Sequence, residues 1–292
     1  MVHYARPVSL DEALALAGAE RWKILAGGTD FYPAQGTRPV TENILDINGL
    51  AELRGISDTA AHIVIGARTT WTDIVRAELP PAFDALQQAG REVGSVQIQN
   101  TGTIAGNLCN ASPAADGVPA LLVLDAEVEL RSAAATRYLP LGDFILGNRR
   151  TLLRPDELVT AVRVPKTSVA GASSFYKLGA RRYLVISIAM AAVRLTLGED
   201  GRIDTAAIAV GACSAVAQRL PDLERALVGV RGDDVEAHVA LEHFDVLSPI
   251  DDVRGSAGYR RAAAREIVLR AIRATLQGHG KTSFAVQQEA VA

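Results

Sequence analysis

Apolar and polar positions in the first half of the chain alternate in short segments of two kinds. Residues 10, 13, 14 and 17 are apolar at helical spacing, and Ser9 with Glu12 forms a capping box, which predicts a helix over residues 10–17. Short apolar runs between turn residues, and one strictly alternating segment, predict strands. These strands are expected at residues 23–26, 42–47, 63–66, 127–131, 138–141 and 157–164.

Further helices are predicted between these strands. Thr70 has the residue type of an N-cap, and the pair Pro80-Pro81 is typical of a helix start. Ser112 and Pro113 predict the N-cap and first turn of another helix in the same way. These helices are expected at residues 70–78, 81–90 and 114–124.

The pattern changes between residues 165 and 175, where small and polar residues predict a linker or a surface loop. Two long β-prone runs follow, at residues 184–197 and 203–211, and the glycines between them are typical of a hairpin turn. Helical stretches complete the chain near residues 219–229, 232–244 and 255–277. The second half is therefore expected to be a small sheet covered by helices, an α+β pair of layers.

Composition excludes several classes of function. The chain has 292 residues, 49% of them hydrophobic, and a net charge of −3, which suffices for two domains with cores of their own. It has no basic block, so neither nucleic acid nor an anionic membrane is an expected partner. No apolar run approaches the roughly 20 residues of a membrane span, and the first residues lack the signal-peptide pattern. We therefore expect a cytoplasmic protein.

The sequence predicts neither a metal site nor a catalytic residue. Its two cysteines, Cys109 and Cys213, form no C-x-x-C pair, so the chain has too few thiolates for an iron–sulfur cluster of its own. We interpret Cys109 as a small buried residue rather than a reactive thiol. The five histidines form no metal-binding pattern, and the nucleophile-elbow and zinc-protease motifs of hydrolases do not occur.

Two loops rich in glycine and small polar residues are the candidate ligand-binding segments. The first is a short strand that breaks into Gly27-Gly28-Thr29-Asp30, where paired glycines let successive backbone N–H groups point into one anion-binding concavity. The second, residues 100–116, has hydroxyls and amides around Gly102 and Gly106, where a ligand can approach the backbone closely. The helix expected after it favours an anionic or polyhydroxylated ligand, and an ordinary Gly-rich connection is the alternative. Neither loop has the spacing of a Rossmann fingerprint or a P-loop.

These two loops resemble one protein family, the flavoprotein (medium) subunits of molybdenum hydroxylases of the xanthine dehydrogenase and carbon monoxide dehydrogenase type. That family has an Ala-Gly-Gly-Thr-Asp/Asn loop near its start, as in residues 26–30. Its second loop reads Thr-Ile/Val-Gly-Gly-Asn and then Ser-Pro-x-x-Asp. Residues 103–107 match the first part except for Ala105 in place of the first glycine, and residues 112–116 match the second part. Similar motifs follow in the same order at residues 150–158, 175–177 and 253–260, so the resemblance covers nearly the whole chain.

The resemblance implies an α+β fold in two domains. Residues 1–172 would form a two-lobed FAD-binding domain of the vanillyl-alcohol-oxidase/PCMH type, with lobes at about residues 1–57 and 58–172. A C-terminal domain of the CO dehydrogenase flavoprotein type would then follow, with a three-stranded sheet plus helices. It would occupy residues 173–282, ahead of a tail at residues 283–292.

The resemblance also assigns residues to FAD. The first loop would follow the pyrophosphate towards the flavin ring, and the second would line the other side. Leu158 and Val159 would lie near the adenine, with Val93 on its other face, although plain strand core is the alternative for the first two. Lys177 would reach the flavin or be a solvated lysine, and Tyr183 would shield the ring or lie at a domain interface. The residues implied to bind FAD are Lys23, Leu25, Ala26, Gly27, Gly28, Thr29, Asp30, Phe31, Thr103, Gly106, Asn107, Asn110, Ser112, Asp116, Leu158, Val159, Lys177 and Tyr183.

The implied function is that of an electron-transferring oxidoreductase subunit that binds FAD. A large subunit would hold the molybdenum cofactor, a small subunit would hold two [2Fe-2S] clusters, and NAD+, oxygen or another acceptor would take the electrons. We expect a dimer of such heterotrimers. Two alternatives are a self-contained FAD-dependent reductase of the same fold, acting on a UDP-sugar enol ether, and a scaffold subunit without flavin.

Overall fold

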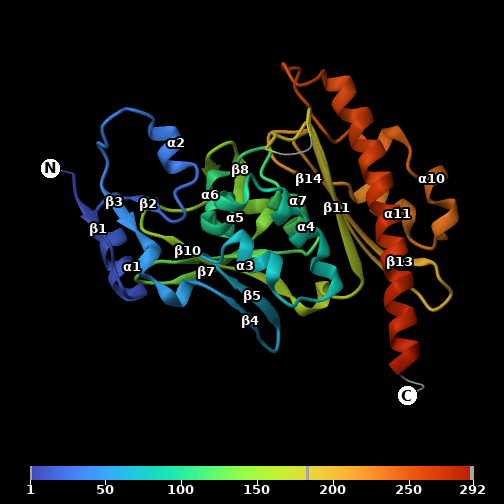
Figure 1. Cartoon of the computed structure of the whole chain (residues 1–292), viewed down its shortest axis with the longest axis horizontal. Helices are drawn as coiled ribbons and strands as arrows, with labels where there is room; N and C mark the ends of the chain where they lie inside the picture. Colours follow the sequence, from blue (N-terminus) through green and yellow to red (C-terminus); the bar gives the residue numbers. More distant parts are fainter. Residues whose placement is uncertain (1, 182–183, 290–292) are drawn as a thin grey trace. The chain divides into compact units, whose positions relative to one another are not determined.

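The computed structural model describes residues 2–181 and 184–289, with side chains as far as residue 278. Its contacts define two compact units (Figure 1). The first unit consists of residues 1–77, 93–112 and 125–166, and the second of residues 78–92, 113–124 and 167–292. Two helical segments from the first half of the sequence therefore belong to the second unit. The domain boundaries implied by the resemblance stay a prediction.

A three-stranded parallel sheet and one amphipathic helix begin the first unit. The strands have the order β1 (Tyr4–Ala5), β3 (Ile44–Asp46), β2 (Lys23–Leu25), and helix α1 (Leu10–Ala19) buries the face on which the sequence placed its apolar residues. The Glu12 N–H donates to the Ser9 hydroxyl at 3.3 Å, which confirms the N-cap. The Glu12 carboxylate accepts from the Val8 N–H, one residue earlier than a capping box requires.

An antiparallel five-stranded sheet forms the rest of the first unit's framework. Its order is β4 (Ile56–Asp58), β5 (His62–Gly66), β10 (Leu158–Pro165), β6 (Glu127–Arg131), β7 (Thr136–Pro140). The central strand β10 is buried along most of its length, whereas β6 alternates as its sequence predicts. A short hairpin of β8 (Ile145–Gly147) and β9 (Arg150–Thr151) follows helix α8 (Leu141–Phe144).

The prediction of a loop over residues 100–116 is wrong for most of that stretch. Two short helices, α5 (Val96–Thr101) and α6 (Ile104–Asn110), occupy it. Ile104, Ala105 and Leu108 are buried on one face of α6, and this burial outweighs the low helix propensity of its glycine and asparagines. The expected helix start at Ser112 is also wrong, because α7 (Gly117–Leu122) begins only after Asp116.

The second unit is a four-stranded antiparallel sheet with helices. Strands β12 (Ala189–Leu197) and β13 (Ile203–Gly211) lie in the two predicted β-prone runs. Strand β11 (Ala172–Leu178) was not placed from the sequence, and the short β14 (Gln218–Arg219) adds a fourth strand to the three that the resemblance implies. A hydrogen-bonded turn at residues 198–201 links β12 to the antiparallel β13, which confirms the predicted hairpin. The long helix α11 (Ala257–Glu289) packs along β11 and β12, with α9 (Pro221–Leu227) and α10 (Val235–His238) nearby in the same unit (Figure 1).

Two other expectations for this unit are corrected. Residues 172–174 were expected in a linker, but they begin β11 and are buried. Ser173 has partners inside the unit, since its hydroxyl accepts from the Ala85 N–H of α4 (Asp84–Glu92) and donates to the Ala82 carbonyl. The helix expected at residues 232–244 is interrupted: two 3-10 turns flank the single turn of α10.

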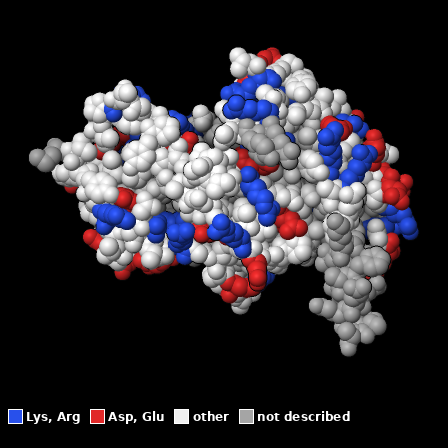
Figure 2. All heavy atoms as spheres, viewed as in Figure 1, with Lys and Arg blue, Asp and Glu red and all other residues white. Residues whose placement is uncertain are grey.

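The other helices of the first unit are α2 (Phe31–Gln35) and α3 (Trp71–Arg76). Thr70 and Asp73 form a complete capping box at the start of α3, as the sequence predicts. No helix in residues 2–181 and 184–289 is long and apolar enough to cross a membrane. On the face that Figure 2 shows, basic and acidic side chains are interspersed, which agrees with the near-neutral net charge.

Candidate functional site

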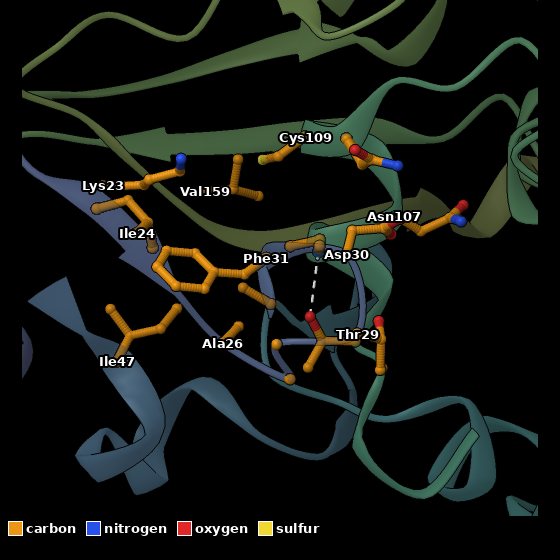
Figure 3. Close-up of a pocket in the computed structure, with 18 of the residues that line it drawn as sticks. Lys23, Ile24, Ala26, Thr29, Asp30, Phe31, Ile47, Asn107, Cys109 and Val159 are labelled. Carbon is orange, nitrogen blue, oxygen red and sulfur yellow. Dashed lines mark hydrogen bonds between the residues drawn. The ribbon is translucent and has the colours of Figure 1, made fainter. Parts of the chain in front are cut away.

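A cavity of about 470 Å³ lies within the first unit, and both Gly-rich segments line it. Further walls come from strand β10 and from the segment that includes the β8–β9 hairpin. Figure 3 shows Ile24, Phe31 and Ile47 gathered on one side, with Thr29 and Asn107 on the other. The cavity thus has an apolar part and a polar part, as a site for a nucleotide cofactor requires.

Both glycines after β2 are needed by the protein itself. A Cβ atom on Gly27 would lie 1.9 Å from the Thr101 carbonyl oxygen at the end of α5. Gly28 has a φ of +72°, and a Cβ there would lie 2.7 Å from the Tyr32 ring. From the sequence, these glycines are explained by an anion-binding concavity of backbone N–H groups, whereas the structure adds that Gly27 lets two segments that line the cavity approach each other closely.

Backbone hydrogen bonds hold helix α6 in place at the cavity. The Trp71 N–H donates to the Gly102 carbonyl at 3.1 Å, and the Ile104 N–H donates to the Thr69 carbonyl at 3.0 Å. Thr103 caps α6 by accepting from the Gly106 N–H at 3.1 Å. The helix therefore presents Thr103, Gly106 and Asn107 to the cavity from a fixed position.

Asn107 has an unmet hydrogen-bonding capacity. Its side-chain Oδ1 is buried and accepts no hydrogen bond among the residues with described side chains. Burying such an oxygen without a partner is unfavourable, and Asn107 lines the cavity. The hydroxyls of a ribityl or ribose chain, or the imide N–H of a flavin, would supply the missing donor. The residues present therefore fit FAD on this observation.

Lys23 and Cys109 line the cavity with little reactivity of their own. Lys23 Nζ donates to the Glu42 carboxylate at 2.9 Å and lies 5.3 Å from the centroid of the Phe31 ring. Burial raises the pKa of the Cys109 thiol to about 12, so the sulfur stays neutral near pH 7. Cys109 is only partly buried, since it borders the cavity. Its neutral thiol agrees with the interpretation of an unreactive residue.

Most of the residues implied to bind FAD are brought together here. Those that line the cavity are Lys23, Ala26, Gly27, Gly28, Thr29, Asp30, Phe31, Thr103, Gly106, Asn107, Asn110, Leu158 and Val159. Leu25 is buried in the first unit and, like Ser112, is not part of the lining. Tyr183 lies outside the described residues. The FAD contacts of all these residues stay a prediction.

Asp116 and Lys177 belong to the second unit and form a buried ion pair there. Lys177 Nζ donates to Asp116 Oδ2 at 2.8 Å and to the Glu92 carbonyl at 3.3 Å, while the Ser187 hydroxyl donates to Asp116 Oδ1 at 3.1 Å. Burial raises the pKa of Asp116, and the Lys177 ammonium opposes that shift. The reading of Lys177 as a solvated lysine is therefore wrong, because its side chain is only 7% exposed.

Several lining residues were not selected from the sequence. Folding brings apolar side chains to the cavity from elements without a motif, and one cation comes from the turn of the β8–β9 hairpin. These residues are Ile24, Ala34, Ile47, Ala67, Trp71, Ile98, Ala105, Cys109, Arg149 and Leu153. Val93 and Gly102, which were named from the sequence, also line the cavity. Ile24, Ala105 and Cys109 were within reach of sequence reasoning, since Ile24 adjoins the first Gly-rich segment and the other two lie inside the second. The remaining residues reach the cavity through tertiary packing.

The fold and this cavity define an α+β protein that binds a nucleotide cofactor, and comparison with known proteins specifies which. The family described as "FAD binding domain in molybdopterin dehydrogenase" matches residues 1–167, and the family described as "CO dehydrogenase flavoprotein C-terminal domain" matches residues 174–275.

In the part of the chain with described side chains, no group of His, Cys, Asp and Glu is arranged to hold a metal ion.

Similar proteins match along nearly the whole chain. The glyceraldehyde dehydrogenase medium chain of Sulfolobus acidocaldarius is 32% identical over 278 residues, which cover 92% of this chain and 96% of that one. The nicotinate dehydrogenase FAD-subunit of Eubacterium barkeri is 33% identical, with coverage of 89% and 91%. Reconstituted CO dehydrogenase from Oligotropha carboxidovorans contains a chain that superimposes with a TM-score of 0.87, at 28% identity and coverage of 95% and 98%.

The chain belongs to the FAD-binding medium subunits of the CO and xanthine dehydrogenase type of molybdenum hydroxylases. This confirms the family and the fold that the sequence motifs indicated, and FAD as the cofactor of this chain. The protein is therefore a component of an oxidoreductase.

Proposed function

We propose that this chain transfers electrons within a heterotrimeric molybdenum hydroxylase located in the cytoplasm. It would take electrons from [2Fe-2S] clusters of a small subunit and pass them to NAD+, oxygen or another acceptor. The observation that carries the proposal is the cavity of about 470 Å³ built by both motif segments, in a chain that matches named medium chains over about nine-tenths of its length.

The residues around the cavity would bind FAD and keep its parts in order. Backbone N–H groups after β2 would face the pyrophosphate, and Thr103 and Asn107 would hydrogen-bond its polar portions. Apolar side chains such as Ile24 and Val159 would exclude water from a ring. When bound, FAD supplies a centre that can exchange electrons singly or in pairs.

Partners follow from the same proposal. A large subunit would hold the molybdenum cofactor and hydroxylate the substrate, and a small subunit would hold the two clusters. The sequence supports placing the clusters on another subunit, because two cysteines, Cys109 and Cys213, cannot supply the thiolates of a cluster. Two such heterotrimers would associate into a dimer, which sedimentation of the purified complex tests.

Anaerobic mixing tests the proposal. The flavin-loaded single chain, shown to be free of molybdenum and iron, is mixed with purines, aldehydes and N-heterocycles while the long-wavelength flavin absorbance is followed. We expect no bleaching until the two partner subunits are added. Bleaching of the single chain by any of these substrates would overturn the subunit proposal.

Two further outcomes identify the alternatives. Oxidation of a reduced nicotinamide by the single chain with a UDP-sugar enol ether as acceptor would identify a self-contained reductase. A folded chain that is colourless after reconstitution with FAD, alone and with its partners, would identify a scaffold without flavin.

A further inference from the structure

The turn of the β8–β9 hairpin places a cation at the cavity. Arg149 lies between Gly147 and Arg150, lines the cavity, and is exposed. Its backbone φ is +55°, in the left-handed region that residues other than glycine and asparagine rarely adopt. Tight hairpin turns favour glycine or asparagine at such a position, so an arginine there is not explained by the turn.

The hairpin leads into a rigid segment. Arg137 forms a two-pronged ion pair with Glu157, at 2.6 and 2.7 Å, and also donates to the Leu152 carbonyl at 2.7 Å. The Glu157 carboxylate accepts from the Arg154 N–H at 2.9 Å. Residues 152–154 are thereby fixed, and Leu153 within them lines the same cavity as Arg149.

Arg149 is the charged lining residue best suited to an anion. The charged side chains in the lining are those of Lys23, Asp30 and Arg149. Lys23 is committed to Glu42, and Asp30 is itself an acid. The guanidinium of Arg149 forms no hydrogen bond or ion pair with the rest of the described chain. An anion that enters this cavity therefore finds one uncommitted cation.

We propose that Arg149 binds the diphosphate of FAD. A diphosphate carries two negative charges, and transferring them from water into a cavity is unfavourable without a positive partner. The planar guanidinium donates paired hydrogen bonds to phosphate oxygens, a geometry that the lysine ammonium cannot reproduce. The strained backbone at Arg149 then has a reason, because it presents this side chain to the same cavity that the glycine loop lines. This inference rests on FAD occupying the cavity.

The test compares ligands with and without phosphate on the full-length chain. FAD and ADP binding are titrated by fluorescence and calorimetry, with adenosine and riboflavin as phosphate-free probes. In Arg149→Gln we expect FAD and ADP to bind about tenfold more weakly, as the loss of one charge-assisted hydrogen bond implies, while adenosine and riboflavin are unaffected. The wild-type affinity for ADP should also fall more steeply with salt than that of the variant.

Two matched variants complete the design. Arg150→Gln removes the same charge from the adjacent residue, which is exposed and does not line the cavity, and should leave all affinities unchanged. Arg149→Asn suits the left-handed backbone better, so it should weaken ADP binding without lowering the melting temperature. This separates ligand binding from a structural role in the turn.

The outcomes are distinguishable. Equal ADP affinity of wild type and Arg149→Gln would overturn the inference and leave the FAD site intact. Equal weakening of adenosine and ADP would also overturn it, because Arg149 would then act on the adenine or on the shape of the cavity. A wild-type chain that binds neither FAD nor ADP would remove the FAD site itself, and the inference with it.

Discussion

A Cβ atom on Gly27 would lie 1.9 Å from the carbonyl oxygen of Thr101. The two residues come from different segments, the turn after β2 and the end of α5, and both segments border the candidate FAD cavity. The carbonyl belongs to the backbone, so it cannot move aside as a flexible side chain would. Glycine at this position therefore sets the distance between two walls of the cavity.

We expect Gly27→Val to abolish FAD binding and to lower the free energy of unfolding by about 3 kcal/mol, as overpacking against backbone does. Circular dichroism and urea unfolding measure stability, and flavin content after reconstitution measures binding. Gly28→Val should also lose FAD, because its φ of +72° disfavours a β-branched residue.

Gly18→Ala is the control for these substitutions. A Cβ on Gly18 meets nothing within 4 Å, and the residue lies inside α1. Alanine there should raise stability by up to about 1 kcal/mol and leave FAD binding unchanged. A Gly27→Val protein with native unfolding behaviour and stoichiometric FAD would contradict the role given to this glycine.

Asn107 gives a prediction in which stability and binding change in opposite directions. Its buried Oδ1 has no partner among the residues with described side chains, so Asn107→Ala should stabilise the flavin-free chain by about 1 kcal/mol, aided by the helix propensity of alanine within α6. The same change should weaken FAD binding about tenfold, because the ligand loses a hydrogen-bond acceptor. Thermal melts without flavin and titration with FAD provide the two measurements. A loss of stability in the flavin-free chain would show that the oxygen already has a partner there.

The fold was predictable from local signals wherever those signals agree with burial. Ser9 and Thr70 cap helices where the sequence placed them, and the alternation of residues 127–131 became strand β6 without change. The hairpin between β12 and β13 followed from its glycines. In these segments the local residue types and the tertiary environment favour the same conformation.

The prediction of a loop over residues 100–116 is wrong for a physical reason. Glycine and asparagine favour loops when taken alone, but the burial of Ile104 and Leu108 stabilises α6 by more than these residues disfavour it. The site had a similar limit. Sequence motifs identified the two Gly-rich walls, whereas Arg149 reaches the cavity only through a hairpin turn that no motif marks.

Glu157 should make stability depend on pH. Its folded pKa is lowered: burial alone would raise it, but the Arg137 guanidinium and the Arg154 N–H favour the carboxylate more strongly. The stabilisation is therefore present above the ordinary pKa of 4.5 and is lost as the pH falls through the folded value. We expect Glu157→Gln to lose about 2 kcal/mol at pH 7 and less at pH 3, measured by urea unfolding. An equal loss at both pH values would show that charge is not involved.

The buried pair of Asp116 and Lys177 provides the last prediction. Each charge is held by the other at 2.8 Å, so removing one leaves its partner buried and uncompensated. We expect Asp116→Asn and Lys177→Met each to lower the free energy of unfolding by about 3 kcal/mol. The double variant should be more stable than the sum of the two losses predicts, because neither charge is then left alone. FAD titration of the same proteins decides whether Lys177 also touches the flavin, as the resemblance implies. If Lys177 contacts the flavin, Lys177→Met and the double variant should lose the same FAD affinity. If Lys177 only pairs with Asp116, the double variant should bind FAD more tightly than Lys177→Met, because it leaves no buried charge without its partner.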